Sequence, residues 1–440
     1  KVHFLQLKFP RMIHPNRNVL ILCFLGARFL VHGLLRTPTP NLIRRAQQQR
    51  IHICSSSPPS SNAFDFGLPS TWDLQSVERL DDFCADGSLV RNANPLLGRP
   101  NVPNSYFVGY DAAVAARVEV SGTSEECPVD QGAFVLAGPR EEVKFSVGTT
   151  RAVIVTCGGL CPGVNTVVRE LVLCLHNQYG ITDVRGVPSG YRGFQDPSKW
   201  RPLTPESVRT LHREGGSTLG TSRGGHDTVA IVDALVQEEV GLMFVVGGDG
   251  TIRGAQKVAA EIRERKLPIG VALVPKTIDN DIPLVDKTFG FDTAVEQARK
   301  AIEVAHTEAV GFPNGLGVVK LMGRHSGFIA MHATLGTGDV DLCLIPEVPF
   351  PMTADGQSEE EEETVLSFIE SRLVKQGYAV VVIAEGAGQD HLAAEAQAAN
   401  ARTDASGNRQ LADVGQWFCG AAKSHLDKQP VCEADKIALK

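Results

Sequence analysis

Short apolar runs alternate with longer amphipathic segments through the last two thirds of the chain. The apolar runs have the length of buried strands, and they occupy residues 152–156, 241–246, 269–274, 315–320 and 378–384, with a shorter one at 341–346. Helical spacing of apolar residues follows at 166–176, 227–240, 252–265, 292–308, 328–335 and 413–426. Because strands that alternate with helices form βαβ units, this pattern predicts an α/β protein with mostly parallel sheets.

The same pattern divides the chain into regions. Residues 65–150 are weakly periodic and rich in Pro and Gly, a pattern that indicates an N-terminal extension. Within it, one strand is expected at 137–145, leading into the core. Residues 151–310 contain the first series of strands and helices, and residues 311–440 contain a second α/β series. At 440 residues the chain is long enough for two or three domains.

The charge distribution sets residues 1–64 apart. They contain nine Lys and Arg but no Asp or Glu, and they end in a Ser-rich stretch at 55–61. This composition predicts an organelle transit peptide and therefore a plastid location. A disordered leader on a cytoplasmic protein is the alternative.

Three further features narrow the function classes. The chain carries a net charge of −7 and its acidic part is the body, which argues against nucleic acid as a partner. The apolar run at 19–35 is interrupted by Arg28 and His32 and is too short for a convincing membrane span. None of the ten cysteines forms a zinc-type pair, and we expect Cys157 and Cys161 to be reduced structural thiols.

Glycine-rich and acidic turns follow the predicted strands of residues 151–310. They lie at 157–165, at 215–225 with Arg223, and at 247–251 with Asp249. Glycine lets backbone N–H groups approach phosphate oxygens, and a helix N-terminus attracts anions. The turns match neither a Walker A motif nor GxGxxG. They predict a phosphate site in which Asp249 contacts Mg²⁺, with a helix N-cap role for Asp249 as the alternative.

The turn at 275–281 (PKTIDND) follows a buried strand and contains two carboxylates. An extended chain would point Asp279 and Asp281 the same way, and two like charges held close require a cation or a shared proton. A base beside a metal carboxylate is what phosphoryl transfer requires. A polar turn with local caps is the alternative. Beyond it, Arg324 suits a transition-state charge, and Glu385 could accept hydrogen bonds from a sugar.

Eight motifs occur in one order between about 137 and 419: VTCGGLCPGVN, GYRGF, TSRGGHD, GGDGT, PKTIDNDI, FGFDTAVE, VVKLMGRHSGF and VIAEGAG. In this set the chain resembles the phosphofructokinase family, and most closely its plant-type ATP-dependent 6-phosphofructokinases. The resemblance implies the phosphofructokinase fold, which has two Rossmann-like three-layer α/β/α domains. Residues 151–310 would bind ATP and Mg²⁺, and residues 311–440 would bind fructose 6-phosphate.

The resemblance also implies the reaction and the residue roles. ATP and fructose 6-phosphate would give fructose 1,6-bisphosphate, a step of glycolysis, by direct in-line transfer. Asp279 would be the base, Arg324 would stabilise the transferring group, and Asp249 and Asp281 would hold Mg²⁺. The implied ATP contacts are Gly159, Arg223, Gly224, Gly248, Asp249, Gly250 and Thr251. The implied sugar phosphate contacts are Thr277, Ile278, Asp279, Met322, Gly323, Arg324 and Glu385.

The chain departs from the family pattern in two places. Gly250 is typical of ATP as donor and Lys276 of pyrophosphate; the combination resembles the plant ATP enzymes, with pyrophosphate as the alternative donor. No Tyr/His-x-x-Arg segment follows residue 426, so the resemblance implies a second domain that is incomplete at its C-terminus. A non-catalytic regulatory homologue is therefore a further alternative. The family also implies an allosteric homo-oligomer, typically a tetramer.

Overall fold

The computed structural model describes residues 2–6, 73–75, 80–84, 89–109, 112–115, 132–136, 138–222, 224–282, 285–353, 364–392, 410–427 and 438–439. The chain forms two compact units. The larger comprises Lys1–Leu20, Glu78–Tyr110 and Ala137–Lys440, and the smaller comprises Ile21–Val77 and Asp111–Leu136. The described part of the smaller unit is a three-stranded sheet in the order β2 (Asp73–Gln75), β5 (Gly132–Val135) and β4 (Ala113–Ala115).

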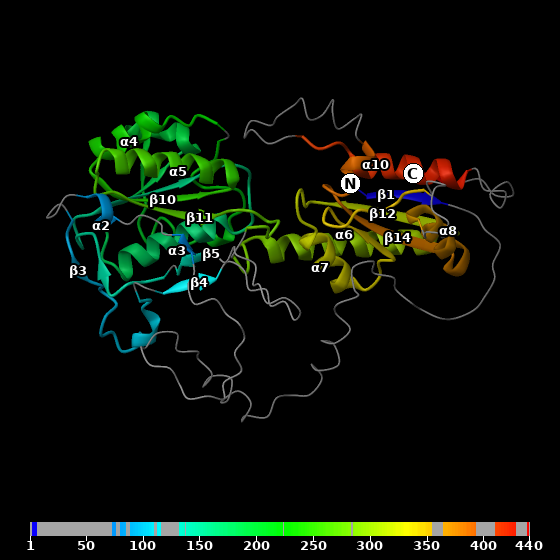
Figure 1. Ribbon diagram of the computed structural model, residues 1–440, viewed down its shortest axis with the longest axis horizontal. Helices are drawn as coiled ribbons and strands as arrows, with labels where there is room; N and C mark the ends of the chain where they lie inside the picture. Colours follow the sequence, from blue (N-terminus) through cyan, green and yellow to red (C-terminus); the bar gives the residue numbers. More distant parts are fainter. Residues whose placement is uncertain are drawn as a thin grey trace, which may run out of the picture. The chain divides into compact units, whose positions relative to one another are not determined.

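The larger unit contains two five-stranded sheets (Figure 1). The first has the order β11 (Gly270–Pro275), β10 (Val240–Gly247), β7 (Arg151–Thr156), β8 (Val184–Val187) and β9 (Arg201–Pro202). The first four of these strands are parallel, and β9 runs antiparallel to β8. A separate two-stranded ladder joins β3 (Asn92–Ala93) to β6 (Glu142–Val143).

Alternating side chains of β7 build a core on each face of the first sheet. Val153 and Val155 pack with α4 (Thr228–Gln237) and α5 (Asp249–Glu264), whereas Ala152 and Ile154 pack with α3 (Val164–Asn177). Figure 1 shows α4 and α5 on one side of the sheet and α3 on the other. Because successive residues of a strand point to opposite faces, a wholly apolar strand produces this three-layer arrangement.

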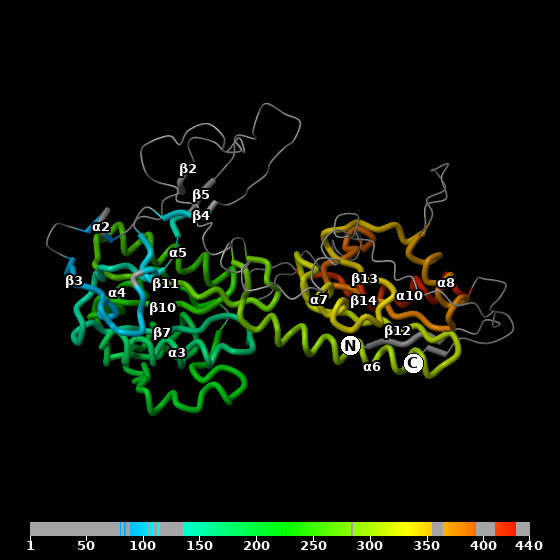
Figure 2. The backbone as a smooth tube through the Cα atoms, turned by 90° about the horizontal axis from the view of Figure 1, so that it is seen from below, coloured from blue at the N-terminus to red at the C-terminus, as the bar shows by residue number. Residues whose placement is uncertain are grey.

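The second sheet has the order β13 (Leu342–Leu344), β14 (Tyr378–Ala384), β12 (Gly315–Leu321), β1 (Val2–Gln6) and β15 (Ala438–Leu439). β12, β13 and β14 are parallel, and β1 pairs antiparallel with β12. Its helices are α6 (Phe291–Gly311), α7 (Phe328–Thr337), α8 (Val365–Gln376) and α10 (Val414–Leu426). Helix α6 packs against β12 and β14 and runs along this sheet (Figure 2).

Shorter elements complete the described residues. They are helix α2 (Leu80–Phe83) and the 3-10 turns η1 (Asn104–Tyr106), η2 (Gly190–Gln195), η3 (Pro197–Lys199), η4 (Leu211–Arg213) and η5 (Gln389–Leu392). Among the residues that the structure describes, no helix is both long and apolar enough to span a membrane. The apolar run at 19–35 lies outside them.

The α/β class with mostly parallel sheets is confirmed, and the differences in detail have local causes. The strand expected at 137–145 is reduced to β6, because this stretch has no continuous apolar run. β8 was not predicted, since its sequence VRGV interrupts the apolar pattern with Arg and Gly. α8 was also missed, although a capping box of Thr364 and Ser367 marks its start. The strand β1 lies within residues 1–64, where a leader was expected.

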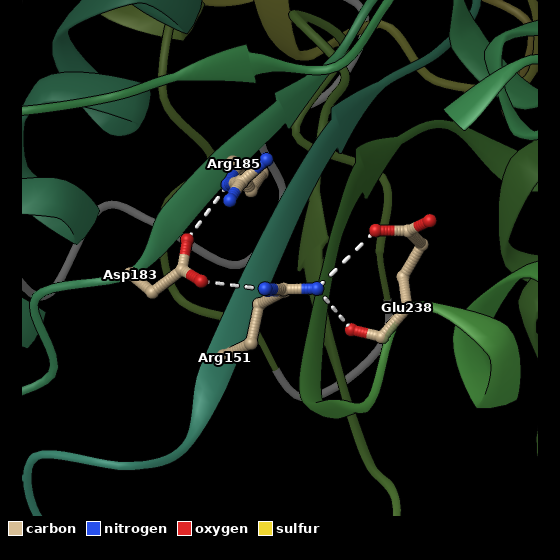
Figure 3. A network of polar contacts seen from close by, with 4 residues as sticks. All are labelled: Arg151, Asp183, Arg185 and Glu238. Atoms are coloured by element: carbon tan, nitrogen blue, oxygen red, sulfur yellow. Dashed lines mark hydrogen bonds and ion pairs between the residues drawn. The ribbon is translucent and has the colours of Figure 1, made fainter. Parts of the chain in front are cut away.

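An ion-pair network holds the amino ends of the first sheet (Figure 3). Arg151 donates to Asp183 at 2.7 Å, and Arg185 donates to the other carboxylate oxygen at 2.7 Å. Arg151 also bonds the carboxylate of Glu238 at 3.2 Å, and its backbone oxygen. Burial alone would raise the pKa of Asp183, but the bonds from the two guanidinium groups outweigh it and lower the pKa. The network ties β7 and β8 to the end of α4, at the edge opposite the glycine turns.

A second polar cluster is buried under the second sheet. Asp341, only 6% exposed, accepts from Arg372 at 2.5 and 2.9 Å, from Gln376 at 3.1 and 3.2 Å, and from the backbone N–H of Val380 at 2.9 Å. These bonds connect the segment before β13 to α8 and β14. Since a buried carboxylate is tolerated only when its oxygens are bonded, Asp341 fixes the helix against the sheet.

We predict that Asp341→Asn destabilises the protein by about 3–5 kcal/mol, because it leaves Arg372, whose side chain is only 14% exposed, without its counter-charge. The measurement is the midpoint and slope of urea unfolding. Asp339→Asn, at an exposed position in the same segment, is the control and should change stability by less than about 0.5 kcal/mol. Equal effects of the two substitutions would contradict the prediction.

Candidate active site

Three turns lie side by side at the carboxyl edge of the first sheet. They follow β7, β10 and β11, whose parallel pairing places Gly247 opposite Pro275. Backbone bonds continue beyond the strands, from Cys157 N–H to Val246 O at 2.9 Å and from Lys276 N–H to Gly247 O at 3.0 Å. The glycine turn, the start of α5 and the PKTIDND segment therefore form one continuous edge, as the sequence predicted.

The first turn of α5 requires small residues before it. A Cβ atom on Gly247 would lie 2.4 Å from the Thr251 side chain, and one on Gly248 would lie 3.3 Å from Lys276 O. Gly248 is the N-cap and supplies no side-chain cap. The alternative N-cap role for Asp249 is thus wrong, because Asp249 is the first helical residue and is exposed. Uncapped N–H groups and the helix dipole suit this end to an anion.

Lys276 is buried beside the glycine turn. It is 8% exposed, and its Nζ lies 3.6 Å from where a Cβ on Gly158 would be. Burial raises the pKa of Cys157 to about 12 and also raises that of Cys161, while the charge of Lys276 opposes both shifts. The two thiols are free and buried, which agrees with their expected structural role.

The loop before α4 closes onto the same turn. Gly158 N–H donates to Ser222 O at 3.2 Å, and the Thr221 hydroxyl donates to Gly158 O. Gly224 adopts a left-handed backbone with φ +74°, which favours glycine. Gly159 and Gly250 are exposed on the neighbouring turns. Arg223 lies outside the described residues.

The PKTIDND segment is not extended. Asn280 has φ 56°, a left-handed backbone, so the segment is not the extended chain on which the expected direction of the two carboxylates was based. The conformation is stabilised because Asn280 Oδ1 accepts the Thr288 N–H at 2.8 Å. Thr277 Oγ1 accepts the Asp279 N–H at 3.1 Å, so Thr277 shapes the turn. Asp281 is exposed, whereas Asp279 is half-buried.

Asp279 has the environment of a proton acceptor. Burial, together with the charges of Asp281 and Glu385, raises its pKa to about 6, while the backbone N–H and charge of Arg324 act in the opposite direction. Its Oδ1 is buried and has no hydrogen-bond partner within the described structure. The Ser326 hydroxyl donates to Asp279 O at 3.1 Å. The turn after β12 thus holds the backbone that carries this carboxyl group.

The turns after β12 and β14 bring Arg324 and Glu385 to this cluster. Glu385 N–H donates to Leu321 O at 2.9 Å, and Gly386 N–H donates to Gly323 O at 3.0 Å. A Cβ on Gly386 would lie 1.9 Å from Arg324 O, so only glycine allows the two turns to approach.

Two other predicted sugar contacts are less closely tied to this cluster. Met322 is 56% exposed. Ile278 packs towards Gly290, where an added Cβ would lie 3.2 Å from its Cγ2. The structure gives neither side chain a contact with the Asp279 carboxyl group.

Sequence reasoning missed residues that hold the site without contributing charge. The buried Tyr191 donates to Thr251 O at 2.8 Å and packs edge-on against His226. Asn165 and Ser326 bond the backbone of loops at the site. All three lie inside the motifs quoted above, as polar residues near glycines. That position could have indicated a structural role, but none of them has the charge that marks a catalytic residue.

Parallel α/β sheets whose carboxyl edges present an open helix N-terminus, carboxylates and an arginine characterise phosphoryl-transfer enzymes as a class. The comparisons specify the family within that class. The family model described as Phosphofructokinase matches residues 151–429. This chain belongs to the phosphofructokinase family.

Its relatives include several proteins of Arabidopsis thaliana. ATP-dependent 6-phosphofructokinase 1 is 45% identical over 375 residues, which cover 85% of this chain and 77% of that protein. ATP-dependent 6-phosphofructokinase 7 is 46% identical over 376 residues, covering 85% and 74%. ATP-dependent 6-phosphofructokinase 5, chloroplastic, is 47% identical over 433 residues, covering 91% and 78%.

We predict that Asp279→Asn stabilises the fold at neutral pH by about 1–3 kcal/mol. The folded protein raises the pKa of this carboxyl group from an ordinary 3.8 to about 6. The cost of ionising it in the fold is therefore present above pH 6 and disappears as the pH falls towards 4. Urea unfolding at pH 7.5 and pH 4.5 measures this, with the exposed Asp286→Asn as control. A gain that is equal at both pH values would contradict the assigned environment.

Proposed function

We propose that the protein is an ATP-dependent 6-phosphofructokinase that phosphorylates fructose 6-phosphate to fructose 1,6-bisphosphate in glycolysis. Relatives of this printed name at 45–47% identity support the activity. The observation that carries the mechanism is Asp279, a half-buried carboxyl group with a pKa raised to about 6 and an unbonded oxygen. A carboxylate with a pKa near the working pH is a suitable general base.

In this mechanism Asp279 accepts the proton of the sugar 1-hydroxyl as its oxygen attacks the γ-phosphorus of ATP. The O–P bond to the sugar forms as the bond to the ADP oxygen breaks, and no covalent enzyme intermediate is required. Arg324 stabilises the negative charge of the transferring group. Glu385, Thr277, Ile278, Met322 and Gly323 are the proposed contacts of the sugar phosphate.

The nucleotide is assigned to the edge formed by the glycine turn and the start of α5. Gly159, Gly224 and residues 248–251 supply backbone N–H groups there, and Arg223 supplies a cation. Asp249 and Asp281 are exposed carboxylates, the hard oxygen donors that Mg²⁺ prefers, and one or two of them with substrate phosphates suffice for that ion. These residues therefore fit Mg²⁺, which would neutralise phosphate charge when bound.

Location and assembly are part of the same proposal. The acid-free composition of residues 1–64 supports a plastid enzyme, and one of the three relatives named above is called chloroplastic. Uptake of the radiolabelled chain by isolated chloroplasts tests the location. A homotetramer is proposed from the family alone, and its mass in light scattering tests it.

We predict that Asp279→Asn lowers kcat by about 10²–10⁴-fold, the usual contribution of a general base. KM for fructose 6-phosphate should change little, because the amide retains the shape of the carboxyl group. Steady-state assays that couple product formation to NADH oxidation measure both constants, and Asp286→Asn serves as the unaffected control. A kcat within threefold of the wild type would remove Asp279 from its role.

The phosphoryl donor is predicted to be ATP. Lys276 is the residue that favours the alternative, since it is buried close to Gly158 and Thr251, where a pyrophosphate donor would need a cation. Parallel assays with ATP and with pyrophosphate decide, and we expect turnover with ATP at least about 100-fold faster. Faster turnover with pyrophosphate would reverse the assignment, and no turnover with either donor would favour a regulatory homologue.

A further inference from the structure

The side chain of Asn165 connects the start of α3 to the loop of residues 214–218, beside the proposed nucleotide site. It lies in the first turn of α3, at the end of the glycine turn of residues 157–165, and is 4% exposed. Its Nδ2 donates to Glu214 O at 2.9 Å, with a longer contact to Gly215 O at 3.5 Å, and its Oδ1 accepts the Thr218 N–H at 2.9 Å. One amide side chain thus bonds a backbone carbonyl group at one end of residues 214–218 and a backbone N–H group at the other.

The loop continues from this clasp through a series of bonds. Gly220 O accepts from the Thr156 hydroxyl at 2.8 Å, which fixes the loop to the end of β7. The Ser222 hydroxyl donates to Ser189 O at 2.6 Å, and Ser189 N–H donates to Leu219 O at 2.9 Å. Ser189 has φ 59°, an unusual backbone for a residue with a side chain. This strained turn therefore directs its carbonyl group at Ser222.

We propose that Asn165 is a positioning residue that sets the affinity for the nucleotide. This inference rests on the proposed function, which assigns ATP to the turn at Gly158 and to the loop that continues into Arg223. Asn165 touches no reacting atom. It fixes residues 214–218, and the bonds at Gly220 and Ser222 carry that constraint to the Gly158 turn.

The chain contains a matched control for this claim. Asn94 is 3% exposed, donates to Arg140 O at 2.8 Å and accepts the Leu96 N–H at 2.9 Å. It is an equally buried amide in the N-terminal extension, with one bond to a distant backbone oxygen and one from a backbone N–H two residues away. Asn165→Ala and Asn94→Ala each remove one donated and one accepted bond of a buried amide and the same side-chain volume, so they should lower the thermal midpoint by similar amounts.

The experiment measures KM for ATP, KM for fructose 6-phosphate and the thermal midpoint of the 440-residue chain. For Asn165→Ala we expect KM for ATP to rise about tenfold, since its ordered loop loses two bonds, while KM for fructose 6-phosphate stays within twofold. Asn94→Ala should leave both constants within twofold. Ser222→Ala, a mild change, should raise KM for ATP about threefold and covers the case in which Asn165→Ala fails to fold.

Three results would overturn the inference: unchanged KM for ATP in both site variants, a parallel rise of both KM values, or the same kinetic change in Asn94→Ala. Calorimetric titration with ADP separates the inference from the proposed function, because it requires no turnover. A wild-type chain that binds ADP without phosphorylating the sugar rejects the function, and the inference then stands if Asn165→Ala weakens ADP about tenfold and falls if it does not.

Discussion

The parallel pairing of β10 between β7 and β11 is the constraint on which the rest of the site depends. It places the ends of three strands in register, so that residues distant in sequence meet at one edge. The two apolar faces of β7 and β10 secure the pairing, because each face packs against its own helices, whereas β11 is only partly buried. The polar turns contribute little to this stability; the sheet supplies it, and the turns are free to carry charge and left-handed glycines.

One of these polar turns carries Asp279, whose ionised form the fold destabilises. A carboxyl group that is buried near Asp281 and Glu385 is held in an unfavourable state when ionised, and a nearby arginine relieves only part of this. Bonds outside the site offset the cost, including the buried Asp341 cluster and the arginine network at the opposite edge of the first sheet (Figure 3). The fold thus combines an unfavourable ionised carboxylate at the proposed active site with hydrogen-bonded ion pairs away from it.

Much of the architecture could be predicted from the sequence, because apolar runs such as those of β10 and β14 indicate the buried strands of a parallel sheet. The location of Asp249, Lys276 and Asp279 at strand ends followed from the same pattern. The left-handed backbone of Asn280 could not be predicted, since its φ depends on a bond to Thr288, eight residues away. The clasp of Asn165 was equally hidden, because its partners belong to a loop some fifty residues later, and local patterns do not encode such contacts.

The bond from Ser326 to the backbone of Asp279 has a consequence for how the protein responds to its surroundings. The carboxyl group of Asp279 belongs to a turn of the first sheet, but Arg324 and Glu385, two of the groups that shift its pKa, belong to turns of the second sheet. The pKa of Asp279 therefore depends in part on groups that the second sheet supplies. A change in the separation of the two turns would change the contributions of Glu385 and Arg324, and with them the pKa of the proposed base.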